Sequence, residues 1–125
     1  MLSTRRVYAT IPAADIERAR KWYEEKLGLR PRTQEPMGLI YDLGAGTGFL
    51  LYPTPNAGKA PNTLASFSST DVKSDVAALK KRGVEFEDYD FPGLKTENSI
   101  ARIGGRAGAW FKDSEGNILA IGESA

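Results

Sequence analysis

The chain of 125 residues contains no cysteine and no histidine. Without cysteine there can be no disulfide, thiolate nucleophile, zinc finger or iron–sulfur cluster. Without histidine the chain lacks the commonest general base and the commonest ligand of transition metals. A bound metal ion would therefore need oxygen ligands from Asp, Glu, Tyr or backbone carbonyls.

An excess of one charge and long apolar runs are also missing. The 17 basic and 16 acidic residues leave a net charge of +1, so no bulk basic surface is expected to bind nucleic acid. Residues 1–13 include two arginines but no apolar stretch long enough for a signal peptide or a membrane span. We expect a cytoplasmic protein that binds neither nucleic acid nor membrane.

The composition that remains is that of one globular domain over residues 1–125. Hydrophobic residues make up 41% of the chain and charged residues 26%, which is enough apolar material for a core.

The first half of the chain predicts a strand, a helix and three further strands. Asp15 is a good helix N-cap, and Gly28 suits the position that ends the same helix. Between them an apolar stripe recurs at helical spacing through Ile16, Ala19, Trp22, Tyr23 and Leu27. Strands are predicted at 7–13, 29–33, 39–43 and 48–52. The Gly-rich residues 44–48 lie between two strands and indicate a hairpin turn.

The second half repeats this order after a loop rich in Pro, Gly and Asn at 53–62. Thr70 or Asp71 begins a second helix, with Val72, Val76 and Leu79 on its apolar stripe, and Gly83 ends it. Strands are predicted at 64–68, 84–86, 107–111 and 118–121.

The two halves are an internal repeat. Asp15 and Asp71 match at an offset of 56, and Gly28 and Gly83 at 55. The segments 38–46 and 108–116 match at an offset of 70, because the second half has an insertion near 91–106. We therefore predict two βαβββ modules in tandem, at 5–53 and 62–123, joined by a linker at 54–61.

Three segments carry a resemblance to a known family: "IPAADIERARKWYEEKLGLRP", "STDVKSDVAALKKRGVEF" and "FKDSEGNILAI". In this order they resemble the vicinal oxygen chelate superfamily, which includes glyoxalase I, bleomycin-resistance proteins and extradiol dioxygenases. The resemblance implies an α+β fold, in which the tandem modules form curved, incomplete-barrel sheets around a concave cavity with the helices outside.

Catalytic members of this family hold a metal with two residues from each module, usually His, Glu or Gln. Carried over to this chain, the ligand positions fall on Tyr8, Leu50, Leu64 and Ala120. None of these is a usual ligand for a divalent metal. The resemblance therefore implies a member without metal ligands, and we expect neither a metal nor another cofactor.

The same positions predict a small, mostly apolar pocket. Strand alternation adds Thr10, Tyr52, Ser66 and Ser68 to its surface, and Trp110 rather than Phe111 is the aromatic residue expected to face it. The predicted ligand-binding residues are Tyr8, Thr10, Leu50, Tyr52, Leu64, Ser66, Trp110 and Ala120. No residue is assigned a catalytic role.

Three functions are open at this point. The first is a homodimeric, bleomycin-resistance-like protein that binds or sequesters a small apolar or aromatic molecule without metal. Bleomycin itself is disfavoured, since it is cationic and the chain has no acidic excess. The second is a metal-dependent lyase, isomerase or dioxygenase of the same superfamily. The third is a structural or interaction domain whose side chains fill the cavity.

Overall fold

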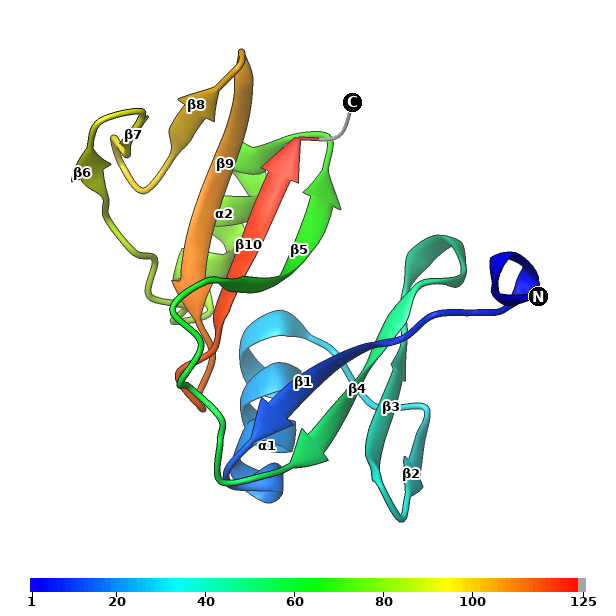
Figure 1. Ribbon diagram of the computed structural model, residues 1–125. Coiled ribbons are helices and arrows are strands. Elements are labelled where there is room, and N and C mark those ends of the chain that lie inside the picture. Colours follow the sequence, from blue (N-terminus) through cyan, green and yellow to red (C-terminus); the bar gives the residue numbers. More distant parts are fainter. Residues whose placement is uncertain (124–125) are drawn as a thin grey trace.

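The computed structural model describes residues 1–123, which form two four-stranded sheets, each with one helix (Figure 1). The first half contains β1 (Ala9–Ala13), α1 (Ile16–Leu27), β2 (Thr33–Glu35), β3 (Gly38–Asp42) and β4 (Gly48–Pro53). The second contains β5 (Thr63–Ser69), α2 (Val72–Lys81), β6 (Asp90–Phe91), β7 (Leu94–Lys95), β8 (Ala101–Ile103), β9 (Arg106–Lys112) and β10 (Ile118–Glu123). Short 3₁₀ turns lie at Leu2–Thr4 and Gly44–Gly46.

The two sheets have the same topology. Their strand orders are β1-β4-β3-β2 and β5-β10-β9-β8, and in each sheet only the first pair is parallel. Neither sheet closes into a barrel, and β6 and β7 form a separate hairpin inside the insertion. The predicted α+β fold with a repeated βαβββ order is therefore confirmed. In the described part of the chain no helix is long and apolar enough to cross a membrane.

Both helices begin and end where the sequence predicts. The side chains of Asp15 and Asp71 accept hydrogen bonds from the amides of Arg18 and Ser74 at 3.0 and 3.1 Å. These bonds satisfy amides that have no partner inside the first turn. Asp71, and not Thr70, is thus the second N-cap.

Two predicted strands are wrong, and the helix ends explain both. The amide of Leu29 donates to the carbonyl of Tyr23, and the amide of Val84 donates to the carbonyl of Leu79. These bonds continue the helix C-termini, so the backbone is not free to pair as a strand directly after them. The first strand after α1 begins only at Thr33, and the segment after α2 makes a single bridge, between Phe86 and Phe111.

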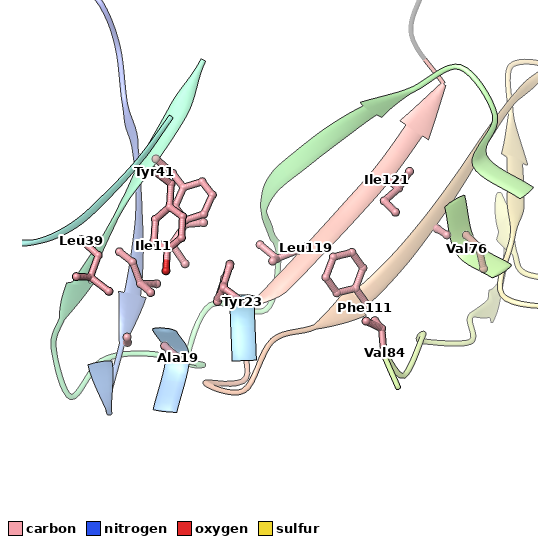
Figure 2. Close-up of a cluster of buried hydrophobic side chains, with 14 of the residues drawn as sticks. Ile11, Ala19, Tyr23, Leu39, Tyr41, Val76, Val84, Phe111, Leu119 and Ile121 are labelled. Atoms are coloured by element: carbon pink, nitrogen blue, oxygen red, sulfur yellow. The ribbon is translucent and has the colours of Figure 1, made fainter. Parts of the chain in front are cut away.

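The core lies on the faces of the two sheets that the helices cover. Alternate residues of each strand point to this side, as expected for a pleated strand. Figure 2 shows the side chains, with Tyr23 of α1 between the two sheets. The labelled residues of the first sheet are Ile11, Leu39 and Tyr41, and those of the second are Phe111, Leu119 and Ile121.

The turn between β9 and β10 connects the second sheet to the first module. The hydroxyl of Tyr23 donates to Asp113 at 2.6 Å, and the side-chain amide of Asn117 donates to the carbonyl of Pro12 at 2.7 Å. The amide of Gly58, in the loop between the halves, donates to the Asn117 side chain at 3.2 Å. This turn therefore contacts the end of β1, the middle of α1 and the connecting loop.

An ion pair completes the connection. The guanidinium of Arg18 donates to both oxygens of Glu115 at 2.9 and 3.1 Å, and the amide of Asp15 donates to the same carboxylate at 2.8 Å. Burial of Glu115 by itself raises its pKa, but the hydrogen bonds from Arg18, Asp15 and Ser114 outweigh burial, and the pKa is lowered. The carboxylate is thus kept ionised at the helix N-terminus, where negative charge is favourable.

Two buried tyrosines give a matched test of the Asp113 contact. Burial, followed by the charge of Asp113, raises the pKa of Tyr23, so its phenol stays protonated and donates. Tyr23→Phe is expected to lower the free energy of unfolding by about 1–3 kcal/mol, because a buried carboxylate loses a donor. Among residues 1–123 the buried hydroxyl of Tyr41 has no hydrogen-bond partner. Tyr41→Phe is expected to be neutral or stabilising.

Urea denaturation of the two variants beside the unchanged protein measures both effects. Equal destabilisation by the two substitutions would show that the Asp113 contact adds nothing beyond ordinary packing.

Candidate functional site

Each sheet has a second face, turned away from its helix, which we call the helix-free face. On the first sheet the helix-free face carries a row of three neighbouring residues, Thr10, Leu50 and Ile40. Tyr52 lies two residues further along β4 on the same face. Thr10 is exposed and Leu50, Ile40 and Tyr52 are half-buried, so this apolar row is open.

The second sheet has the matching row on its own helix-free face. Ser66, Ala120 and Trp110 are neighbours across β5, β10 and β9. They occupy the places that Thr10, Leu50 and Ile40 hold in the first sheet, as the offsets of 56 and 70 require. Phe111, the next residue, is fully buried in the core, whereas Trp110 is half-buried on the opposite face.

Two aromatic residues of the insertion extend this surface. The ring of Tyr89 lies 5.6 Å from the indole of Trp110 in an edge-to-face arrangement, and Phe91 lies 5.8 Å from Tyr89. Such contacts orient the rings and contribute beyond the buried area. Phe91 remains 52% exposed, so the cluster presents a free aromatic edge.

Leu64 lies at an irregular point of β5. The register with β10 shifts between Ile118 and Leu119, leaving Leu64 opposite no single partner, as in a β-bulge. Its side chain is half-buried against the core. It therefore belongs less clearly to the helix-free face than Ser66 does.

Tyr8 lies just before β1, and its hydroxyl is already engaged. It donates to Asp42 at 2.7 Å, and the other oxygen of Asp42 pairs with the guanidinium of Arg32. The guanidinium of Arg6 lies 5.4 Å from the centre of the Tyr8 ring. These residues form a polar border beside the apolar row, which we call the Tyr8–Asp42–Arg32 border.

Gly48 allows Tyr8 to reach across the sheet. A β-carbon at this position would lie 2.7 Å from a ring carbon of Tyr8 and 2.2 Å from the carbonyl oxygen of Tyr41. Both distances are far below a van der Waals contact, so a side chain here would displace the ring. The hydrogen bond between Tyr8 and Asp42 therefore requires a glycine at position 48.

The electrostatics of the border follow from its hydrogen bonds. Donation from Tyr8, followed by the Arg32 hydrogen bond and charge, lowers the pKa of Asp42. The same contacts, with Tyr8 first, raise the pKa of Arg32. The border therefore contains an ionised pair, Asp42 and Arg32, at neutral pH.

A cavity of about 610 Å³ lies between the two modules. It is lined by Ala9 and the residues 43–45 and 47–49 on one side, and by the edge of β5 at 64–68 on the other. Of the eight predicted ligand-binding residues, only Leu64 and Ser66 line it. Tyr8, Thr10, Leu50, Tyr52, Trp110 and Ala120 do not, so this cavity does not gather the predicted set.

The side chains at the four family ligand positions do not fit a divalent metal. Leu50, Leu64 and Ala120 have no donor atom, and the Tyr8 phenol is committed to Asp42. Among residues 1–123 no three His, Cys, Asp or Glu side chains lie close enough together to hold a metal ion. No metal-dependent step can be derived for this site.

Several surface residues of the site were missed from the sequence. Alternation within 38–42 could have placed Ile40 and Asp42 on the helix-free face, since Leu39 and Tyr41 lie on the core side. Nothing local indicates Arg32 or Tyr89, because neither lies in a strand that the sequence predicts correctly.

The border can be tested by titration. Tyr8→Phe removes the main cause of the lowered Asp42 pKa while keeping the ring, so this pKa is expected to rise toward its ordinary value. Carboxyl carbon NMR measures it directly. Tyr52→Phe, on the same face without a contact to Asp42, is the matched control. An unchanged Asp42 pKa in Tyr8→Phe would mean that Arg32 alone sets it.

Comparisons with known proteins agree with this architecture. Residues 5–121 match the sequence profile of the "Glyoxalase/Bleomycin resistance protein/Dioxygenase superfamily". No curated protein sequence matches the chain significantly.

Solved structures with the same fold include three of similar length. UcmS2 has a TM-score of 0.76 and 19% identity, covering 97% of this chain and 98% of its own. TnmS3, an antibiotic binding protein from Streptomyces sp. CB03234, has a TM-score of 0.67 and 22% identity, covering 100% and 99%. A glyoxalase/bleomycin resistance protein from Catenulispora acidiphila DSM 44928 has a TM-score of 0.67 and 19% identity, covering 98% and 100%. With its sheets, its repeat and a profile match over nearly its whole length, the chain belongs to the glyoxalase/bleomycin resistance protein/dioxygenase superfamily.

Proposed function

We propose that this protein binds or sequesters a small apolar or aromatic molecule on its helix-free faces, without a metal. The ligand-binding residues are Tyr8, Thr10, Leu50, Tyr52, Leu64, Ser66, Trp110 and Ala120. The observation that carries the proposal is the pair of matching rows, Thr10–Leu50–Ile40 and Ser66–Ala120–Trp110. Each combines a hydroxyl at one end with an apolar or aromatic side chain at the other.

Such rows suit a ligand with an apolar body and few polar groups. Small-molecule sites are mostly apolar with a few placed hydrogen-bonding groups, and an indole offers a flat face for stacking. The Trp110–Tyr89–Phe91 cluster favours an aromatic ligand over an aliphatic one. The antibiotic binding by TnmS3, which has the same fold, supports the proposal by analogy only.

We further propose that the protein is a homodimer in which the first module of one copy faces the second module of its partner. Within one chain the cavity between the modules contains only two of the eight residues. Both β1 and β5 are edge strands of their sheets and do not pair with each other. A partner copy would cover both helix-free faces and complete two equivalent sites, as isologous symmetry requires.

We also propose that the two modules span residues 5–53 and 62–123 with a linker at 54–61, and that the protein is cytoplasmic and binds neither nucleic acid nor membrane.

Thermal denaturation with aromatic metabolites and antibiotics tests ligand binding, with neutral 2-naphthol as a probe. A ligand at 100 times its Kd is expected to stabilise the protein by ~2.7 kcal/mol. Trp110→Ala is expected to abolish this shift, because it removes the stacking surface. Met37→Ala, an equally apolar truncation at a residue that is 73% exposed, should leave it unchanged.

Two outcomes would overturn the binding proposal. The absence of any stabilising compound would favour an interaction domain. One tightly bound equivalent of nickel, zinc, iron or manganese after purification would favour the metal-dependent enzyme.

A mixed dimer tests where the site is formed. Leu50→Arg and Ser66→Arg each place a long cation on one helix-free face and should each abolish 2-naphthol binding. If each site lies between two chains, a dimer purified with one copy of each variant has one unaltered site and regains half of the binding. If each site lies within one chain, the mixed dimer binds none. A monomer by light scattering would exclude the dimer itself.

A further inference from the structure

A second cavity, of about 230 Å³, lies on the other side of the second sheet, between that sheet and the helices. Its lining residues are Leu27 and Leu29 after α1, Phe67, Ser68, Phe111 and Ile121 of the sheet, and Asp75, Ala78 and Leu79 of α2. Figure 2 shows Phe111 and Ile121 with Tyr23 of α1 on one side and Val76 of α2 on the other. None of the eight proposed ligand-binding residues takes part in this cavity.

The internal repeat explains why there is space here. Seven and eight residues after its N-cap, α1 carries Trp22 and Tyr23, and Tyr23 is fully buried against its own sheet. At the same distances from its N-cap α2 carries Ala78 and Leu79. Two large rings are thus replaced by a methyl group and an isobutyl group, which leaves volume between α2 and the sheet.

The second module also has a carboxylate, that of Asp75, where the first module has an apolar residue. Four residues after the N-cap, α1 has the fully buried Ala19, whereas α2 has the solvent-exposed Asp75 at the edge of the cavity. One oxygen of Asp75 accepts from the hydroxyl of Ser69 at 2.5 Å, and the Ser69 oxygen accepts from the amide of Asp71 at 3.0 Å. These bonds orient the carboxylate.

The second oxygen of Asp75 is free to accept from a ligand. Within residues 1–123 it accepts no hydrogen bond, and no Lys or Arg pairs with Asp75. An oriented carboxylate beside the half-buried side chains of Leu27, Phe67 and Leu79 is complementary to a cation attached to an apolar group.

We propose that this cavity is a second binding site, for a primary amine carrying one aromatic ring on a short chain. The volume sets the size of the ligand: it exceeds the ~150 Å³ of a cavity that holds benzene and is below the ~300–1,000 Å³ of drug-sized sites. The ring packs against the half-buried side chains of Phe67 and Leu79, and the ammonium donates to Asp75. Because Leu27 and Leu29 come from the first module, the amine contacts both halves of the chain.

Titration with 2-phenylethylamine, followed by amide NMR, tests this site on the whole protein. Amides of Ala78, Leu79 and Phe111 are expected to shift, and phenylacetate, which has the same ring and the opposite charge, should bind at least tenfold more weakly. Asp75→Asn keeps the acceptor for Ser69 but removes the charge, and should weaken the amine roughly two- to fivefold, as loss of an exposed ionic contact predicts.

Two controls separate this site from the helix-free face. Glu25→Gln, which removes an exposed carboxylate from α1, should leave amine binding unchanged. Trp110→Ala should abolish 2-naphthol binding and spare the amine, so either site can fail alone. Equal affinity for the amine and the acid, no effect of Asp75→Asn, or no shift at the cavity amides would each overturn the proposal.

Discussion

The arrangement of the two modules depends on one buried turn, residues 113–117 between β9 and β10. Its carboxylates, those of Asp113 and Glu115, accept from Tyr23 and Arg18 of α1, and Asn117 donates to the carbonyl of Pro12 at the end of β1. The partners lie 90 to 105 residues apart in the sequence. Buried polar groups are costly unless they are paired, so these contacts specify one arrangement of the modules rather than a range of them.

The duplication gives two sheets of the same topology that carry different side chains at matched positions. On the helix-free faces, the row Thr10–Leu50–Ile40 corresponds to the row Ser66–Ala120–Trp110. The second face therefore has an indole and a methyl group where the first has two branched aliphatic side chains. On the faces that the helices cover, the aromatic side chains belong instead to the first module. The first helix is tightly packed by its aromatic residues, while the second leaves a cavity beside Asp75. Large and small residues at matched positions thus decide where each module can accept another molecule.

Much of the fold could be read from local patterns. Both N-caps, the helix ends at Gly28 and Gly83 and the strands β1, β3, β4, β5, β9 and β10 follow from capping chemistry and from periodicity. The sequence did not predict β2 and β8 at their observed residues. The strands predicted at 29–33 and 84–86 fail where the chain must first complete the hydrogen bonds of a helix end. Periodicity cannot detect that requirement, since it depends on the carbonyls of the preceding turn.

The order of residues by itself determined the family, the repeat, both helices and the absence of side chains that could hold a metal at Tyr8, Leu50, Leu64 and Ala120. Those properties depend on residue type and on short spacing along one chain. Only the tertiary structure decided that Tyr8 is bound to Asp42 across Gly48, that Tyr89 reaches Trp110, and that Asp75 borders a cavity. Each of these contacts joins residues whose separation or loop position carries no periodic signal, so packing of the whole chain was needed to bring them together.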